Sequence, residues 1–166
     1  CNNNSEEICS EIIEVQPSFV QIIKNFNTSA YGEIYLLAYK MFINNPITGI
    51  GINNFKYMCE TNDFYKNLMV NYDCASHPHN IYIQWLSEGG LFVFFTFILY
   101  LLFLITFIVK NEGEKKFKII SLIVILIMFW PIMSTGSLVK NWYGIITFFI
   151  IGICLCLSRF KKNSYN

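Results

Sequence analysis

The second half of the chain alternates long apolar runs with short polar linkers. The first run, residues 91–109 (LFVFFTFILYLLFLITFIV), contains no charged residue. At about 1.5 Å per helical residue it is long enough to cross a hydrocarbon core of roughly 30 Å. Two further apolar runs occur at 119–134 and 142–158. Three such runs in close succession favour transmembrane helices over the buried helices of a soluble protein.

The first half has a different pattern, with apolar residues at helical spacing in 17–26 and 31–43. In the second stretch an apolar side is separated from Glu33, Lys40 and Asn44, which predicts amphipathic helices that lie on a membrane or pack against other spans. The apolar side consists of Ile34, Tyr35, Ala38, Met41 and Phe42. The expected fold is an all-α polytopic membrane protein, with residues 1–90 as an outward-facing helical region before three transmembrane helices.

A glycine-containing segment, NNPITGIGINNF at 44–55, comes directly after the helix predicted at 31–43. Asn45-Pro46 ends the preceding helix, and Gly49 and Gly51 permit a tight backbone path. The Gly-x-Gly pair is a weak signal for a phosphate-binding loop, because it lacks a third, helix-opening glycine. A glycine turn that joins two helices is the simpler interpretation.

Composition supports the membrane interpretation. Hydrophobic residues make up 54% of the 166-residue chain and charged residues only 14%, with a mean hydropathy of +0.44. A soluble domain carries roughly 25% charged residues. The net charge of +1 gives no indication of nucleic-acid binding. The chain begins at Cys1 without a signal peptide, so we expect the C-terminal part of a longer protein, with a lipid-anchored Cys1 as an alternative.

Positive charges are distributed unevenly between the linkers, which predicts an orientation. The stretches 110–118 and 159–166 are rich in lysine and arginine, whereas the turn at 135–141 contains Lys140 alone. Because such residues accumulate on the cytoplasmic side, both rich stretches should face the cytoplasm and residues 1–90 should face outward. Trp130, Trp142 and Tyr143 would then lie at the outer boundary, where amphipathic rings favour the headgroup region.

Cysteine placement agrees with this orientation. Cys154 and Cys156 lie in the third apolar run and are expected to pack as small apolar residues. The other four fall on the outward side, where disulfides persist, and allow three connectivities. We favour Cys59–Cys74, which closes a short loop. Cys1 and Cys9 would pair with each other or with residues upstream.

Two histidines flank a proline in the segment CASHPHN at 74–80, just before an apparent helix. Pro78 predicts that this helix begins there, with Ser76 or His77 as the cap and His79 in the first turn. The positive helix end would keep His79 neutral, and the unpaired first-turn amides could hold an anion. Asn80, Gln84 and Glu88 come next at four-residue spacing and predict a polar stripe that faces a wet cavity.

Three interpretations of the histidine pair remain open. The first is a capping histidine on a solvated helix. The second is a zinc site made by Cys59, Cys74, His77 and His79, which the spacing C-x14-C-x2-H-x-H disfavours because it misses the usual structural-zinc patterns. The third is general acid–base chemistry at the membrane surface.

Two motifs in fixed order resemble the O-antigen ligase and O-antigen polymerase superfamily. They are NPITGIGINNF at 45–55 and HPHNIYIQWLSEGG at 77–90, and the stretch 130–142 is similar to the last outer turn of the family. The resemblance extends over about residues 30–160. It implies an integral membrane glycosyltransferase of the bacterial inner membrane with a periplasmic active face. Such an enzyme needs no metal or other cofactor.

The resemblance also implies a reaction and its residues. A glycan would pass from an undecaprenyl-pyrophosphate carrier to lipid A-core (ligase) or to another glycan (polymerase). His79 would be the catalytic base. Substrate-binding residues are expected at His77, Asn80, Lys56, Gln84 and Glu88.

The chain departs from the family in its cationic residues. The family holds pyrophosphate with arginines, but this chain has one arginine, Arg159, on the expected cytoplasmic side. We expect the phosphate-binding arginines upstream, so that this stretch alone is inactive, with Lys56 and Lys40 as the alternative. A protein of another class, a non-enzymatic membrane component of polysaccharide export or chain-length control, would have no need of a neutral histidine at a helix start.

Overall fold

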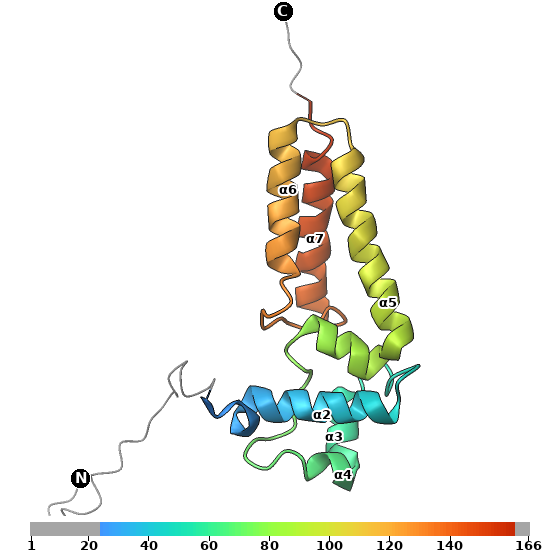
Figure 1. Ribbon diagram of the computed structural model, residues 1–166, viewed down its shortest axis with the longest axis vertical. Helices are drawn as coiled ribbons and strands as arrows, with labels where there is room; N and C mark the ends of the chain where they lie inside the picture. The colour runs from blue at the N-terminus through green and yellow to red at the C-terminus, as the bar shows by residue number, and fades with distance from the viewer. Residues whose placement is uncertain (1–23, 162–166) are drawn as a thin grey trace, which may run out of the picture.

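The computed structural model describes residues 24–161, and within that range every regular element is a helix. Three helices stand side by side, and the others lie across one end of them (Figure 1). The elements are η1 (Phe26–Thr28), α2 (Ala30–Asn44), α3 (Phe55–Thr61), α4 (Asp63–Lys66), α5 (Ile81–Lys110), α6 (Lys115–Met128) and α7 (Asn141–Leu157). The all-α prediction is confirmed for these residues. Cys1, Cys9 and most of the helix predicted at 17–26 lie outside the described residues.

Helix α2 confirms the helix predicted at 31–43. Its N-cap is Ser29, whose hydroxyl oxygen accepts a hydrogen bond from the Gly32 amide, and it ends before Asn45-Pro46. Its apolar side packs against α3, α4 and the start of α5. The buried residues of this cluster are Ile34, Leu37, Ala38, Met41, Phe55, Cys59 and Tyr65. The polar side contains one exception, because Glu33 is buried.

Helix α5 is broken at Gly90, which has a left-handed φ of 64° and a ψ of −167°. The residues before the break lie against α2, and those after it form the first upright helix (Figure 1). Among the described residues, α5 is the one helix long and apolar enough to cross a membrane, while the apolar stretch Trp142–Leu157 of α7 is shorter. The second and third spans therefore remain predictions.

The upright helices share one apolar core and also expose apolar surface. Ser121 of α6 donates a hydrogen bond to the Cys154 carbonyl of α7 over 2.9 Å. Large hydrophobic side chains on the outer faces are exposed, among them Phe92, Phe95, Leu99, Phe103, Ile123, Leu126, Ile145 and Phe149. Exposed apolar surface of this extent is unusual for a soluble monomer and typical of helices in a bilayer.

The two lysine-rich stretches lie at the same end of the helices. The Glu114 amide donates to the Phe160 carbonyl over 3.0 Å, and the Lys161 ammonium pairs with Glu112 over 2.7 Å. The turn between α6 and α7 lies at the opposite end, next to the histidine segment (Figure 1). Helix α6 ends at Met128, earlier than the predicted boundary of 134, because Pro131 has no amide hydrogen to continue a helix.

Candidate functional site

The loop 45–51 binds directly to the break in α5. A helix break leaves carbonyl groups and amides without helical partners. This loop supplies amide donors for the free carbonyl groups and carbonyl acceptors for the free amides. The four hydrogen bonds are Ile50 N to Ser87 O (3.0 Å), Gly51 N to Glu88 O (2.9 Å), Leu91 N to Pro46 O (2.8 Å) and Phe92 N to Ile47 O (3.4 Å). The two sequence motifs at 45–55 and 77–90 therefore lie against each other and are held together by backbone hydrogen bonds.

Glycines make this close approach possible. A Cβ atom on Gly49 would lie 2.3 Å from the Glu88 carbonyl carbon, and one on Gly90 would lie 2.4 Å from the Ile47 oxygen. Both residues also have positive φ, which other residues adopt only with strain. The structure therefore supports the glycine turn rather than the phosphate-binding loop.

The predicted polar stripe does not face a wet cavity, and that prediction is wrong. Gln84 and Glu88 are only 2% and 1% exposed, and protein groups satisfy them. The side-chain amide of Gln84 donates to Glu88 Oε2 over 2.9 Å and to Ser137 Oγ over 2.7 Å. The Phe55 amide donates to Glu88 Oε1 over 3.2 Å, at the start of α3, where Asn54 provides no side-chain cap. A buried carboxylate needs such donors, so these residues join α3, α5 and the 131–140 turn.

The helix start predicted at Pro78 is also wrong. Helix α5 begins at Ile81, and Asn80 is its cap, with Oδ1 accepting from the Tyr82 amide (3.0 Å) and the Ile83 amide (3.2 Å). Asparagine is among the strongest capping residues. His79, just before the cap, has a left-handed φ of 56°, which redirects the chain ahead of the helix. Neither Ser76 nor His77 is the cap.

The turn 131–140 holds both histidines in place. His77 Nε2 lies 3.3 Å from the Thr135 carbonyl oxygen, and the Thr135 amide donates to the His79 carbonyl over 2.8 Å. The other side-chain nitrogen of His77 lies 2.9 Å from Ser76 Oγ. The side-chain amide of Asn80 donates to the Pro131 carbonyl over 2.7 Å. Residues more than fifty positions apart in the sequence thus form one unit.

His79 lies between aromatic rings from two elements. Its ring centroid is 4.2 Å from that of His77 and 6.2 Å from that of Tyr31, which meets it edge to face. The Tyr31 hydroxyl lies 3.5 Å from Ser134 Oγ, so α2 also reaches the turn. The histidine side chains are half-buried rather than enclosed.

The environment favours neutral histidines. Burial is the main cause that lowers the pKa of His79, and the Lys140 ammonium lowers it further. Burial also lowers the pKa of His77, with smaller contributions from His79 and Lys140 and an opposing one from its Thr135 contact. The expected neutral state of His79 therefore rests on burial and Lys140 rather than on a place inside the first turn of α5.

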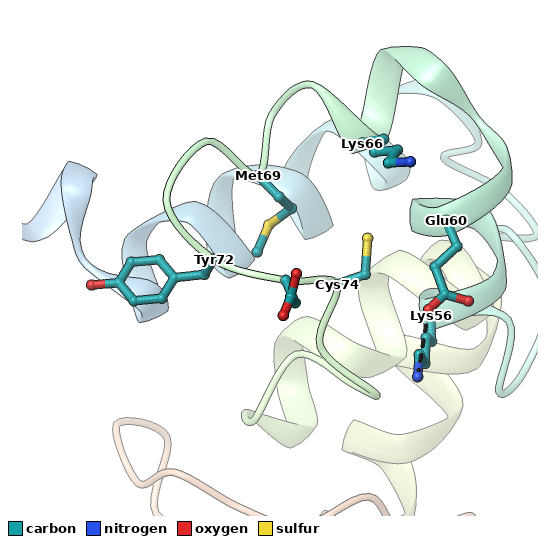
Figure 2. Close-up of a pocket in the computed structure, with 7 residues that line it drawn as sticks. Lys56, Glu60, Lys66, Met69, Tyr72 and Cys74 are labelled. Atoms are coloured by element: carbon teal, nitrogen blue, oxygen red, sulfur yellow. Dashed lines mark ion pairs between the residues drawn. The ribbon is translucent and has the colours of Figure 1, made fainter.

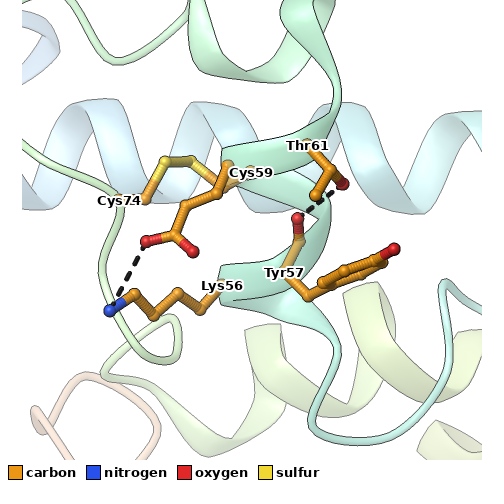
Figure 3. Close-up of polar contacts among 6 residues, drawn as sticks. Lys56, Tyr57, Cys59, Thr61 and Cys74 are labelled. Carbon is orange, nitrogen blue, oxygen red and sulfur yellow. Dashed lines mark hydrogen bonds and ion pairs between the residues drawn. A yellow bond between two sulfur atoms is a disulfide. The ribbon is translucent and has the colours of Figure 1, made fainter.

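Lys56 is not part of this unit. It is exposed on α3, pairs with Glu60 over 3.4 Å, and lines a separate pocket (Figure 2). The disulfide Cys59–Cys74 is confirmed, with the two Cα atoms 5.9 Å apart, and lies beside that pocket (Figure 3). Since the disulfide uses both thiols, Cys59 and Cys74 cannot ligate zinc. Arg159 lies at the opposite end of the helices, above the Phe107 ring.

Three residues of this region were missed by the sequence reasoning. The residues near Glu33 in the sequence do not indicate that it is buried, because its partners are the distant amides of Val70 and Asn71. Tyr31 lies on the predicted α2 surface, and only the tertiary structure brings it to His79. Lys140 could have been found from the sequence, as the only lysine of the turn 131–140.

The two motifs fall within a region that matches a known protein family. A sequence model of the family described as O-antigen ligase matches residues 10–98, which include the 45–51 loop, the histidine segment and the break in α5. Searches of curated proteins and of solved structures gave no match. Because the matched stretch covers more than half of the chain, the chain belongs to the O-antigen ligase family.

Proposed function

We propose that this protein is a membrane glycosyltransferase that moves a glycan from undecaprenyl pyrophosphate to lipid A-core or another polysaccharide acceptor. Family membership supports the reaction class. The observation that carries the proposal is the half-buried His79, whose ring contacts those of His77 and Tyr31 at the end of the molecule opposite the lysine-rich stretches. A polymerase of the same family is the alternative within this class.

His79 is the proposed general base. It accepts the proton of the acceptor hydroxyl while that oxygen attacks the anomeric carbon of the donor sugar. The bond from the anomeric carbon to the pyrophosphate oxygen breaks, and undecaprenyl pyrophosphate leaves with the bonding electrons. The lowered pKa of His79 keeps the imidazole in the form that can accept a proton at neutral pH.

Lys140 is the proposed cation for the leaving pyrophosphate. It is the one lysine of the turn that holds the histidines, and its charge acts on both of them. Within residues 24–161 its ammonium has no ion pair. A lysine acts as a point charge, without the bidentate geometry of arginine, so arginines upstream remain part of the proposal.

The other predicted substrate-binding residues divide into two groups. His77 remains a candidate for substrate contact, because it is half-buried next to His79. Asn80 is buried, and its side chain caps α5 and donates to the Pro131 carbonyl, so its proposed role is to hold the turn in place. Gln84 and Glu88 also act by holding the turn and α3 in place. Lys56 belongs to the separate pocket beside the disulfide.

The proposed topology has residues 1–90 and 135–141 in the periplasm, spans at 91–109, 119–134 and 142–158, and 110–118 and 159–166 in the cytoplasm. It is supported by the shared end of the two lysine-rich stretches and by the apolar outer faces of α5, α6 and α7. The proposed location is the bacterial inner membrane, with the histidines on the periplasmic face.

The test is glycan transfer by the purified full-length protein in lipid nanodiscs. Undecaprenyl-pyrophosphate-linked glycan is supplied with or without lipid A-core, and products are separated by gel electrophoresis. Transfer that requires lipid A-core identifies a ligase, and lengthened carrier-linked glycan identifies a polymerase. If neither product forms, while the same protein restores surface polysaccharide in cells that lack it, the non-enzymatic alternative is favoured.

A further inference from the structure

A polar pocket lies beside the disulfide, apart from the histidines (Figure 2). Its volume is about 420 Å³, which is within the range of small-ligand sites. The lining residues are Lys56, Glu60, Lys66, Met69, Tyr72, Asp73 and Cys74. The two ammonium groups and two carboxylates balance in charge, and the Tyr72 side chain forms one edge of the pocket, apart from the lysines (Figure 2).

The 69–74 segment of the pocket wall is bonded to the rest of the protein at two points, although most of the lining side chains are exposed. Glu33 is only 4% exposed, and its carboxylate accepts hydrogen bonds from the Val70 amide (3.1 Å) and the Asn71 amide (3.2 Å). The disulfide fixes Cys74 at the other end of the segment. Between these two anchors, Tyr72 remains 47% exposed. Irregular segments that a scaffold fixes while their side chains stay accessible are typical of binding surfaces.

The polar groups of the wall are available to a ligand. Within residues 24–161, the side chains of Lys66, Tyr72 and Asp73 make no hydrogen bond or ion pair with the protein. Ammonium groups donate hydrogen bonds and carboxylates accept them, which suits a ligand with many hydroxyl groups. An exposed tyrosine ring provides an apolar face with a polar edge, which suits the C–H face of a pyranose ring. The balanced charge gives no preference for a strongly anionic ligand.

We propose that this pocket binds pyranose units of a glycan chain at a distance from the reacting bond. The inference rests on the proposed function, because a polymeric substrate extends beyond its reacting end. Three residues after Cys74 the same segment reaches His77, so the pocket wall continues into the histidine unit. Binding of remote sugar units would let the protein retain long chains while one end reacts.

The test uses the free glycan as probe. Mild acid releases it from its undecaprenyl carrier, so it contains neither lipid nor pyrophosphate, and binding to the full-length protein in nanodiscs is measured by saturation-transfer NMR and calorimetry. Tyr72→Ala should weaken binding about fivefold to tenfold, the size expected for loss of one aromatic contact. Tyr57→Ala is the matched control, because Tyr57 is exposed on the opposite side of α3 from the disulfide (Figure 3).

Two further variants separate this inference from the proposed function. His79→Ala should bind the free glycan as the wild type does, since the probe lacks the reacting bond. Lys66→Ala should weaken binding in the same direction as Tyr72→Ala. If the wild type does not bind the glycan, or if Tyr72→Ala and Tyr57→Ala bind it equally, the pocket assignment is wrong. If Tyr72→Ala loses binding while His79→Ala still transfers glycan, the pocket stands and the catalytic assignment fails.

Discussion

His79 and Asn80 set the geometry of the candidate site at the scale of single residues. A non-glycine residue with positive φ is uncommon, although histidine and asparagine are among those that tolerate it best. Such conformations persist where surrounding contacts enforce them, often at functional sites. Here the Asn80 side chain caps α5 and also donates to the Pro131 carbonyl. One side chain therefore fixes both the helix start and the turn that faces His79.

The two histidines should respond differently to substitution. His79→Ala should reduce glycan transfer by about 100- to 10,000-fold, the usual contribution of a positioned base, without changing membrane insertion. His77→Ala removes the contact with the Thr135 carbonyl, worth on the order of 1 kcal/mol, and should retain measurable transfer. Both variants are compared in one host that lacks the native enzyme, by the polymer attached to its acceptor. Wild-type transfer by His79→Ala would remove His79 from the mechanism.

The pH dependence of transfer should report the lowered pKa of His79. A base is active when neutral, so kcat/KM should fall only below the ordinary histidine pKa of about 6.5, as the pH drops through the lowered value. Lys140→Gln removes one cause of that shift, so the acidic limb should move to higher pH. Steady-state rates from pH 5 to 8 for the wild type and the variant measure the two acidic limbs. An acidic limb that does not move would mean that Lys140 has no electrostatic effect on the base.

At the scale of elements, the break in α5 connects the helices at one end of the molecule to the upright helices. The loop 45–51 satisfies the carbonyls and amides that the break exposes, and Glu88 supplies a partner for the first amide of α3. The break in α5 and the start of α3 are thereby bonded to other segments of the protein. The stability of residues 24–90 should depend on these hydrogen bonds and on the Cys59–Cys74 disulfide.

Gly90→Ala should destabilise the protein by about 1–3 kcal/mol or more, because alanine must adopt a positive φ and its Cβ would lie 2.4 Å from the Ile47 oxygen. Gly152→Ala is the control, since a Cβ there meets nothing within 4 Å. Alanine is also the better helix former, so this control should be neutral or stabilising. Thermal unfolding in detergent compares the two. Equal midpoints would show that the break does not require glycine.

The disulfide should stabilise the helical region that precedes the break in α5. Replacing both Cys59 and Cys74 by serine opens a loop with a sequence separation of 15, and the expected loss is about 3 kcal/mol. Non-reducing peptide mapping of the wild type should recover the two cysteines linked. Recovery of both as free thiols from protein isolated in its native compartment would contradict the assignment, as would a variant with unchanged stability.

At the scale of the whole molecule, opposite ends have different chemistry. The histidine segment and the disulfide-linked segment lie at one end, whereas the lysine-rich stretches meet at the other (Figure 1). Apolar side chains on the outer helix faces lie between them. This arrangement agrees with a membrane protein that places its reactive groups on one side only.

Cysteine labelling should show which end faces outward. A membrane-impermeant maleimide applied to intact cells with a permeabilised outer membrane should modify Val70→Cys, which is exposed in the outward region. Lys116→Cys, exposed at the other end, should react only after the inner membrane is opened. Labelling of Lys116→Cys in intact cells would reverse the proposed topology.

The sequence by itself determined the features that depend on local patterns. Apolar runs and their lengths predicted upright helices, Asn45-Pro46 predicted the end of α2, and the outward cysteines predicted the disulfide. The ordered motifs at 45–55 and 77–90 were enough to indicate the family. These features depend on helical periodicity, backbone restrictions and residue spacing, which can be read along the chain.

Only the tertiary structure decided what surrounds His79 and which polar residues are buried. Pro78 favoured a helix start, but Asn80 had a distant partner in the Pro131 carbonyl, and that contact is invisible in local sequence. Gln84 and Glu88 looked solvent-facing by their spacing, yet Ser137 and the Phe55 amide satisfy them inside the molecule. Lys56 lines a separate pocket, and Lys140 belongs to the turn that contacts the histidines. Long-range hydrogen bonds and charges decide these positions, because burial of a polar group depends on partners that the chain brings together only when it folds.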